Sequence, residues 1–276
     1  CEPGEIVGYV TEGAARKCGL PAGIPVVVGG HDTQFAIIGS GAKSHEATLS
    51  SGTWEILSFR SDSFAPTRTG FEEGLIIEAD VQPCFWNPQL LMMGSAVLEW
   101  IRKMFFADLN TEEYKTLIRE AEGVPPGAGG LTFIPSFVRD SGPTRKFGIK
   151  GTILGLTLSA SRGDIYRAAL EGLSSQLRMA LQTLTEATGF QAKMTRVVGG
   201  GSKNNLWNQI RADVTNLPVV TSGEKEATAL GAALTAFVGI GQYSSLSEAQ
   251  KSIYSEEQTF EPSANQQVYE GLFKRY

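Results

Sequence analysis

An acidic side chain stands at the end of an apolar stretch near the start of the sequence. In "GIPVVVGGHDTQFAIIGSG" (23–41), the apolar run leads through two glycines to His31 and Asp32, and a second apolar segment follows. Ligands of α/β proteins bind beyond the carboxyl ends of buried strands, where Asp32 could take the proton of a substrate hydroxyl. An acid at this position could equally cap the next helix by accepting a backbone N–H. Both roles fit Asp32, whereas His31 is expected to pack or to form hydrogen bonds rather than to react.

A second candidate group is the glycine turn in "VVGGGSKNN", where Gly199, Gly200 and Gly201 precede Ser202 and Asn204. Glycine permits backbone conformations that a side chain forbids, and the N-terminus of the helix that follows favours an anion or the edge of a nucleoside. The spacing matches neither the dinucleotide-binding fingerprint nor the Walker loop. The turn therefore predicts either a nucleotide contact or simply a tight connection between strand and helix.

A third turn, "SSGTW", lies between two predicted strands and contains Ser51, Gly52 and Thr53. Its hydroxyls and clustered N–H groups could bind phosphate oxygens, as backbone nests do. An ordinary hairpin explains the same residues. No metal site is predicted, because four acids of this region have no metal-ligand spacing: Asp32, Glu46, Glu55 and Glu78.

These residues need strands and helices to position them. Pro25 to Gly29 is predicted as a fully buried strand, and Thr33 to Ser40 as the helix behind Asp32. The other predicted elements are a helix over 11–18, strands on both sides of the 51–53 turn, strand pairing over 74–87, a helix over 93–106, a long helix from Ser161 to Gly189, a strand before and a helix after the 199–204 turn, a strand over 219–221, a helix over 226–241 and helices in 245–276. Strand pairs followed by alternating helices and strands indicate an α/β domain with a mixed sheet and helices packed on its faces.

Composition limits the classes of protein that fit. The 276-residue chain has a net charge of −5, which argues against nucleic acid or an anionic membrane as its main partner. Its three cysteines are too few and too scattered for a disulfide framework or a zinc site, and they indicate reduced thiols in the cytoplasm. No stretch approaches the roughly 18 apolar residues that a membrane-spanning helix needs.

Taken together, the turns and helices resemble a known family. Five segments occur in the order found in the second half of the FGGY carbohydrate kinases: "PAGIPVVVGGHDTQ", "LSSGTWEIL", "RAALEGLSSQL", "VVGGGSKNNLWNQIRAD" and "EATALGAALTAFVGIG". Within that family, "GHDTQFAIIGSG" together with "LSSGTWEIL" looks most like the bacterial enzymes that phosphorylate L-fuculose, and next like those that phosphorylate L-rhamnulose. The resemblance implies an actin-like ATPase (ribonuclease H-like) fold and the phosphorylation of a sugar hydroxyl by ATP with Mg²⁺.

The resemblance also implies a role for each candidate residue. Asp32 matches the acid that serves as the catalytic base. The other matches are nucleotide contacts: Gly52 and Thr53 at the phosphates, Gly94 at the nucleotide, and Gly199, Gly200, Gly201, Ser202 and Asn204 around the adenosine. Gly231 and Ala229 would let a helix pack closely behind the nucleotide. No ligand of Mg²⁺ is assigned in this chain.

The family pattern includes a further domain before the point at which this sequence begins. Residues 1–43 resemble the last strand and helix of that first domain, and 44–276 resemble a complete second, ATP-binding domain. The resemblance therefore implies half of a kinase, inactive without its N-terminal domain. The apolar residues left uncovered in 1–43 could instead pair two copies as a homodimer.

Two interpretations from other classes are also open. A non-catalytic actin-like nucleotide-binding module would use the same glycine turns, but it would not need the acid at Asp32. A nicotinamide-dependent dehydrogenase fits less well, because the glycine spacing is wrong and the ribose-binding acid is missing. Asp32 is therefore the residue that separates a kinase from a binding module.

Overall fold

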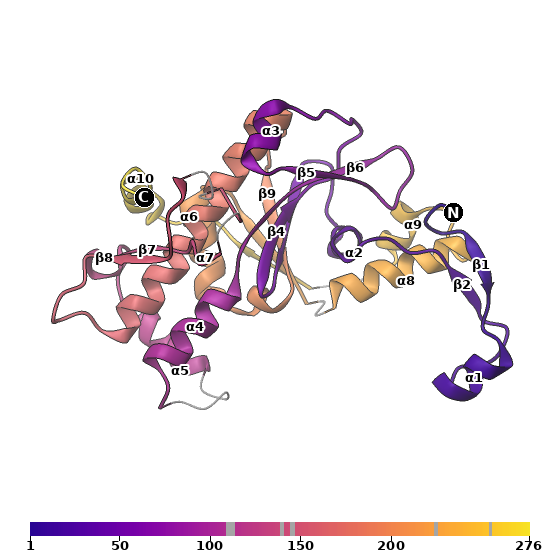
Figure 1. Cartoon of the computed structure of the whole chain (residues 1–276), viewed down its shortest axis with the longest axis horizontal. Helices are drawn as coiled ribbons and strands as arrows, with labels where there is room; N and C mark the ends of the chain where they lie inside the picture. Colours follow the sequence, from indigo (N-terminus) through magenta and orange to yellow (C-terminus); the bar gives the residue numbers. More distant parts are fainter. Residues whose placement is uncertain (109–113, 139–140, 144–146, 224–225, 254–255) are drawn as a thin grey trace.

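A seven-stranded mixed sheet runs through the middle of the computed structural model (Figure 1), which describes residues 1–108, 114–138, 141–143, 147–223, 226–253 and 256–276. Its strands are β3 (Glu46–Ser51), β4 (Trp54–Ser58), β5 (Ile76–Ala79), β6 (Trp86–Met93), β9 (Met194–Val198), β10 (Val219–Ser222) and β11 (Glu257–Phe260). Their order in the sheet is β11-β10-β9-β3-β4-β6-β5. Strand β9 pairs in parallel with β3 and β10, and the remaining pairs are antiparallel. The predicted strands around the 51–53 turn, in 74–87, before the 199–204 turn and at 219–221 are confirmed.

The two faces of this sheet differ in polarity. Side chains alternate along a strand, so Ala47 and Leu49 of β3 lie on one face, in an apolar core. Glu46 and Thr48 point to the other face and are buried there. The apolar face is covered by helix α6 (Arg162–Thr188), which adds a row of leucines to the core. The polar face is available for side chains that hydrogen-bond or carry charge.

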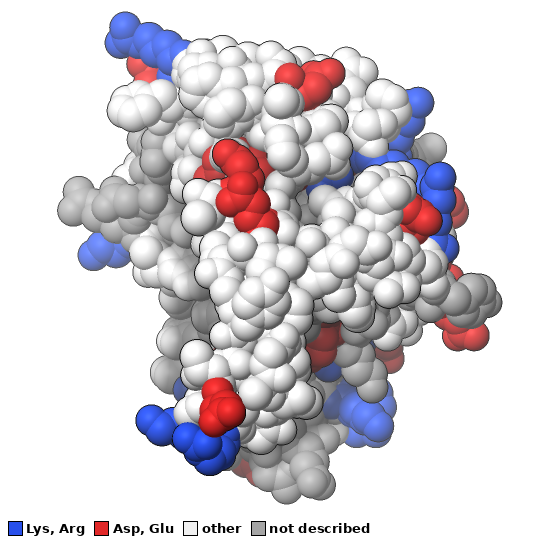
Figure 2. All heavy atoms as spheres, turned by 90° about the vertical axis from the view of Figure 1, so that its right-hand side faces the viewer, with Lys and Arg blue, Asp and Glu red and all other residues white. Residues whose placement is uncertain are grey.

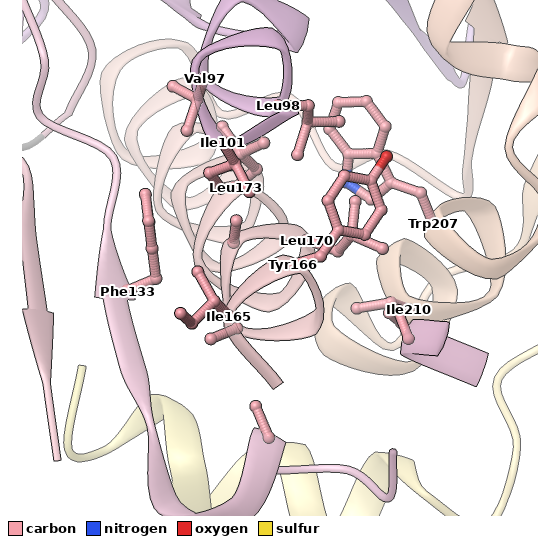
Figure 3. Close-up of a cluster of buried hydrophobic side chains, with 14 of the residues drawn as sticks. Val97, Leu98, Ile101, Phe133, Ile165, Tyr166, Leu170, Leu173, Trp207 and Ile210 are labelled. Atoms are coloured by element: carbon pink, nitrogen blue, oxygen red, sulfur yellow. The ribbon is translucent and has the colours of Figure 1, made fainter. Parts of the chain in front are cut away.

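Helix α6 has ends that are set by local signals. Ser161 precedes the helix and forms a capping box with Asp164, and Gly189 follows it with a φ of 75° in the left-handed region. These are the boundaries that the sequence predicts. Part of α6 also packs with α4 (Ser95–Phe105) and α7 (Asn205–Thr215) around a second apolar core, which Figure 3 shows in detail. No helix in the described part of the chain, α6 included, is both long and apolar enough to cross a bilayer.

Two helices touch through glycine on the polar side of the sheet, where α2 (Asp32–Ser40) packs against α8 (Ala227–Gly239). A Cβ on Gly39 would lie 1.8 Å from a carbonyl oxygen of α8, and a Cβ on Gly231 would lie 2.0 Å from a carbonyl oxygen of α2. Only residues without a Cβ allow this approach. Gly231 thus has the close-packing role that the resemblance implies, whereas Ala229 is exposed.

Residues 1–31 form an arm that projects from the sheet at the right of Figure 1. The arm consists of β1 (Ile6–Tyr9), α1 (Glu12–Cys18) and β2 (Pro25–Val27). Its two strands form a separate antiparallel sheet. The arm contacts the rest of the molecule at the end of α8, where a Cβ on Gly239 would lie 2.3 Å from a carbonyl oxygen of the arm. The predicted helix over 11–18 is confirmed within this arm.

The prediction of a fully buried strand at Pro25 to Gly29 is wrong for this chain. The side chain of Val26 is 43% exposed, because β2 has one neighbouring strand and α8 packs only against its other face, at Val27. Figure 2 views the molecule from the arm's side and shows a largely uncharged surface with small groups of acidic and basic residues. The exposed apolar residues of the arm are Ile6, Val7, Tyr9, Leu20, Ile24 and Val26.

The C-terminal region differs in part from the helices predicted for it. Strand β11 lies there, antiparallel to β10 at the edge of the sheet. Three of its four residues are exposed and polar, so the alternation that marks a strand in a sequence is absent. The remaining elements are α3 (Arg68–Glu73), α5 (Tyr114–Glu122), β7 (Thr132–Ile134), β8 (Thr152–Leu154), α9 (Leu246–Lys251), α10 (Gln266–Phe273) and the short 3₁₀ helices η2 (Ala128–Gly130) and η4 (Gly200–Lys203).

Candidate functional site

The glycine turn after β9 lies against the end of β3. The backbone of Gly199 has φ 83° and ψ −171°, a conformation almost confined to glycine. A Cβ on Gly201 would lie 2.0 Å from Oγ of Ser51, so no side chain fits between the turn and the strand. In contrast, nothing lies within 4 Å of a Cβ built on Gly200. The turn is therefore packed on one side and has open space on the other, where a ligand can approach the backbone.

A buried ion pair supports the strand end on which this turn packs. Oγ of Ser51 donates to Oε1 of Glu55 at 2.7 Å and accepts from Nη2 of Arg211 at 2.7 Å, and Arg211 also pairs with Glu55. All three residues are at most 1% exposed, and the guanidinium lies 3.6 Å from the ring of Trp207. Burial lowers the pKa of Arg211, and the nearby Glu55 carboxylate opposes that shift. The Ser51 hydroxyl is thus buried and held in this network, and its proton is donated to Glu55 rather than left for a phosphate.

The 51–53 turn packs against the start of α4. The N–H and the hydroxyl of Ser95 both donate to the carbonyl oxygen of Gly52, at 2.9 and 2.8 Å. A Cβ on Gly94 would lie 2.7 Å from that oxygen, which brings the two predicted glycines together. The N–H of Gly52 donates to the carbonyl oxygen of Trp54 at 2.9 Å, so it is not a free donor for a phosphate. Thr53 is exposed, and its hydroxyl has no hydrogen-bond partner among the described residues.

Ser202 and Asn204 hold the shape of the glycine turn. Oγ of Ser202 donates to the carbonyl oxygen of Gly199 at 2.7 Å. Oδ1 of Asn204 accepts from the N–H of Trp207 at 3.0 Å and caps α7. Asn208 donates to the carbonyl oxygen of Ser202 at 2.7 Å. Asn204 is only 8% exposed, so this residue has a structural role as well as a small surface for a ligand.

Asp32 is the first residue of α2, and its side chain is 74% exposed. The N-cap is His31, and within the described residues the Asp32 carboxylate accepts no backbone N–H, so the capping role that the sequence allows is not found. Nε2 of His31 lies 3.3 Å from Oδ1 of Asp32. Nδ1 of the same ring lies 2.8 Å from Oγ1 of Thr33 and 3.2 Å from Oε2 of Glu78. The structure therefore has an accessible carboxylate beside an imidazole that two neighbours orient.

The 51–53 turn contacts both Gly94 and the 199–204 turn, so these three groups lie together. Asp32 lies apart from them. Among the described residues, the Asp32 carboxylate forms no hydrogen bond or ion pair with these groups, and its ion-pair partner is His31. Helix α2 provides the connection, because Ala36 shares a small buried cluster with Val198, the last residue before the glycine turn. Asp32 lies about one helical turn before Ala36. The carboxylate is thus held at one end of a helix whose later residues pack beside the glycine turn.

The site fits a nucleotide better than a metal ion bound by protein side chains alone. Gly200 and Thr53 offer open backbone and a free hydroxyl, as a phosphate or ribose contact requires. Glu55, the acid that follows the 51–53 turn in the chain, is buried and paired with Arg211. Across the described residues, no group of three or more histidines, cysteines or acids is placed to hold a metal ion.

Replacing Gly201 by alanine is expected to lower the free energy of unfolding by about 1–3 kcal/mol, the usual effect of overpacking. The new Cβ would overlap Oγ of Ser51, which its bonds to Glu55 and Arg211 hold in place. Chemical denaturation measures the change. The matched variant is Gly200→Ala, whose Cβ meets open space, and it should stay within about 0.5 kcal/mol of the parent. Equal losses in the two variants would contradict this account of the turn.

Residues 47–240 match the C-terminal domain of the FGGY family of carbohydrate kinases. The chain belongs to this family. The matched range contains the 51–53 turn, Gly94 and the 199–204 turn, and Asp32 lies before it. The resemblance noted in the sequence is thereby confirmed for this FGGY chain.

Curated relatives match nearly the whole of the FGGY chain. L-fuculokinase of Escherichia coli (strain K12) is 40% identical over 269 residues, which are 98% of this chain and 55% of that protein. L-fuculokinase of Haemophilus influenzae is 41% identical over 253 residues, 91% of this chain and 52% of that protein. Xylulose kinase of Bacillus subtilis (strain 168) is 30% identical over 281 residues, 100% of this chain and 54% of that protein. The FGGY chain therefore spans about half the length of the curated relatives it matches.

Solved structures share the fold. A ligand-bound xylulose kinase from Lactobacillus acidophilus has a TM-score of 0.86 at 22% identity, covering 100% of this chain and 55% of that one. Plasmodium falciparum glycerol kinase with ADP has a TM-score of 0.81 at 22% identity, covering 99% and 53%. At these identities the likeness concerns the fold alone. The predicted fold class is confirmed: an α/β actin-like ATPase (ribonuclease H-like) domain with a mixed sheet flanked by helices.

Two residues that support the site from below are not predicted from the sequence. Arg211 and Glu55 lie inside the segments that carry the family resemblance, but no role is assigned to them from sequence. A cation such as Arg211 among the apolar residues of an amphipathic helix is a usable signal, because a buried charge needs a partner. The identity of that partner depends on the fold, since Glu55 is far away in the chain.

Proposed function

We propose that this FGGY chain is the C-terminal part of a cytoplasmic, ATP-dependent sugar kinase that converts L-fuculose to L-fuculose 1-phosphate. The observation that carries the proposal is the accessible carboxylate of Asp32, at the start of a helix whose later residues pack beside the glycine turn. The sugar rests on the relatives, because the two L-fuculokinases are 40% and 41% identical and the xylulose kinase 30%. A reducing compartment is consistent with Cys1, Cys18 and Cys84, all of which are free and exposed.

The nucleotide would be bound mainly through backbone. Gly200 has open space where its Cβ would be, and Thr53 has an exposed hydroxyl that no described residue hydrogen-bonds. Gly199 and Gly201 would shape the turn at the adenosine, and hydrogen bonds of Ser202 and Asn204 would hold that shape. Gly52 and Gly94 would leave room for the phosphates, because neither has a side chain. Phosphoryl transfer asks the protein chiefly for such alignment and for charge stabilisation. This division of roles explains why the turns contain so few reactive side chains.

Asp32 would act as the base. As the sugar hydroxyl oxygen forms a bond to the γ-phosphorus, the bond from that phosphorus to the β–γ bridging oxygen breaks and ADP leaves. The hydroxyl proton passes to an oxygen of the Asp32 carboxylate. His31 lies 3.3 Å from that carboxylate, and its contacts with Thr33 and Glu78 would keep the imidazole on one side of it. The other side of Asp32 would be left to the sugar.

When bound, Mg²⁺ would neutralise part of the charge on the ATP phosphates. Asp32 is exposed, so the unshielded carboxylate and the phosphates would repel each other without such neutralisation. No other candidate residue of the glycine turns carries a negative charge. We therefore assign no Mg²⁺ ligand to these turns.

A first domain is the partner that we propose for the arm. Residues 1–43 would belong to that domain, and 44–276 would form the ATP-binding domain. The exposed apolar residues of β1 and β2 support this division, because a strand pair with one bare face needs a further layer or further strands. Pairing of two arms in a homodimer would cover the same residues and is the competing arrangement.

The test is an ATP-consumption assay of the full-length protein with L-fuculose, L-rhamnulose and D-xylulose. The value of kcat/KM for L-fuculose should exceed the other two by roughly ten-fold or more, since a site built for one set of hydroxyls discriminates strongly. The 276-residue chain, assayed beside it, should release no ADP in response to sugar, because we assign most of the sugar contacts to the first domain. A preference for L-rhamnulose would reassign the substrate, and turnover by the isolated chain would refute the proposed division.

A further inference from the structure

A cavity lies away from the residues assigned above. It has a volume of about 580 Å³ and opens between the loop that follows α2, the end of α9 and the polar face of the sheet. It is at the opposite end of α2 from Asp32, and none of the candidate nucleotide contacts lines it. Small-molecule sites in proteins occupy roughly 300–1,000 Å³. The cavity is therefore large enough for a metabolite of its own.

Cations dominate the lining of this cavity. The charged residues that line it are Lys43, Arg60, Arg196, Lys251 and Glu257. Arg196 forms two ion pairs: its Nε lies 2.5 Å from the Glu46 carboxylate, and its Nη1 lies 2.6 Å from the Glu257 carboxylate. Among the described residues, neither lysine has an ion-pair partner within 4 Å. Lys43 and Lys251 thus add positive charge that no ion pair within 4 Å balances among the described residues, although the charge of Lys251 also acts on the carboxylate of Glu248.

Arg60 gives the cavity an oriented donor group. Its Nε is 3.0 Å from Oδ2 of Asp80, and that carboxylate is fully buried and accepts a further bond of 2.7 Å from Asn87. The guanidinium carbon lies 5.9 Å from the centre of the Phe85 ring, which also lines the cavity. One edge of the guanidinium is therefore fixed by Asp80, and the Nη nitrogens are left for another acceptor. An arginine held in this way suits a phosphate or carboxylate group.

Two residues of the lining have buried polar atoms that lack a partner. Nη2 of Arg60 and Oγ of Ser222 form no hydrogen bond with any described residue. A buried donor without an acceptor costs about 1–3 kcal/mol, so such groups are rare unless something else satisfies them. Both belong to one cavity, together with the polar side chains of Gln82 and Ser247. These two atoms have almost no accessible surface, so a ligand with several acceptor oxygens would satisfy them after the Arg60 and Ser222 side chains turn toward the cavity.

We infer that the cavity between α2, α9 and the sheet binds a phosphorylated small molecule. Its phosphate would be held by Arg60, Lys43 and Lys251, and its hydroxyl groups by the serine and glutamine side chains. The volume argues against inorganic phosphate alone, which would fill a small part of the cavity. The inference concerns the described residues only and does not depend on which sugar the protein phosphorylates.

The test is calorimetric titration of the full-length protein, in the absence of ATP, with glucose 6-phosphate, glucose and inorganic phosphate. Glucose 6-phosphate should bind, glucose should not, and inorganic phosphate should bind more weakly. Lys43→Gln and Lys251→Gln, which alter exposed side chains, should each weaken binding roughly ten-fold or more, as expected for a lost charged hydrogen bond. The control is Lys103→Gln, an exposed residue of α4 outside the cavity, which should leave the affinity unchanged.

Three results would overturn the inference. The first is no binding of glucose 6-phosphate at millimolar concentration. The second is binding that Lys43→Gln and Lys251→Gln leave unchanged, which would place the ligand elsewhere, for example in the sugar site. The third is equal affinity for inorganic phosphate and glucose 6-phosphate, which would exclude a contribution from the rest of the molecule. Arg60→Lys adds a check on geometry, because it keeps the charge near Asp80 but removes the planar donor pair and should also weaken binding.

Discussion

Replacing Asp32 by asparagine in the full-length protein is expected to lower kcat for sugar phosphorylation by about 10²–10⁴, the usual contribution of a general base. Asparagine has nearly the same shape, but it cannot accept the hydroxyl proton. The side chain is 74% exposed and caps no helix, so the fold should not change. The KM for ATP should also change little, because Asp32 does not contact the glycine turns. Steady-state kinetics, with thermal unfolding as a check on folding, measures both quantities.

The matched control is Asp62→Asn, which removes an exposed acid from a loop and should keep the parental kcat. If Asp32→Asn retained nearly the parental rate, the base would have to be another residue. ATP binding without any sugar turnover in the parent protein would favour the non-catalytic nucleotide-binding module. The two variants and the parent together therefore separate a kinase from a binding module.

Replacing Arg211 by methionine is expected to lower the free energy of unfolding by about 3–5 kcal/mol, because it leaves the buried Glu55 without its partner. Both residues are at most 1% exposed, so water cannot replace the lost interaction. Ser51 loses a donor at the same time, and the glycine turn packs directly on Ser51. Chemical denaturation measures the loss, and weaker nucleotide binding should accompany it.

The double variant Arg211→Met with Glu55→Gln should recover part of this stability, since no buried charge is then left unpaired. The surface comparison is Arg16→Gln, which breaks an ion pair whose side chains are 75% and 85% exposed. Such pairs contribute at most about 1 kcal/mol. If Arg211→Met and Arg16→Gln had the same effect, the buried pair would have no special role in holding the site.

Elements with strong local signals could be predicted from the sequence. Helix α6 begins after Ser161 and ends before Gly189 as predicted, because a capping box and a left-handed glycine are local features. The hairpin at Gly52 is predicted because its turn residues, Ser51 to Thr53, are also a local feature of the sequence. Strand β11 is missed, because its exposed polar residues give no alternation and its pairing with β10 is a long-range event.

The site residues that depend on local features could likewise be predicted, and those that depend on long-range contacts could not. The candidate glycines are predicted because a place where two backbone segments pack closely requires glycine, and glycine can be recognised in the sequence. Gly201 and Gly94 are such places, since a Cβ on either would overlap a neighbouring residue. The buried pair of Arg211 and Glu55 is not found, because α7 and β4 are far apart in the chain and only folding brings these two residues together. The exposure of β2 could not be predicted either. Its valines indicate a strand, but whether a strand is buried depends on other segments of the chain.

The crossing of α2 and α8 affects how precisely Asp32 is positioned relative to the glycine turns. Side chains between helices act as adjustable spacers, because rotamer changes absorb small differences in distance. At Gly39 and Gly231 no such spacer exists, and the crossing angle is determined by main chain resting on main chain. The far end of α8 supports the arm, and the arm leads into Asp32. The orientation of the carboxylate relative to the glycine turns therefore depends on two positions at which even one methyl group would force the helices apart.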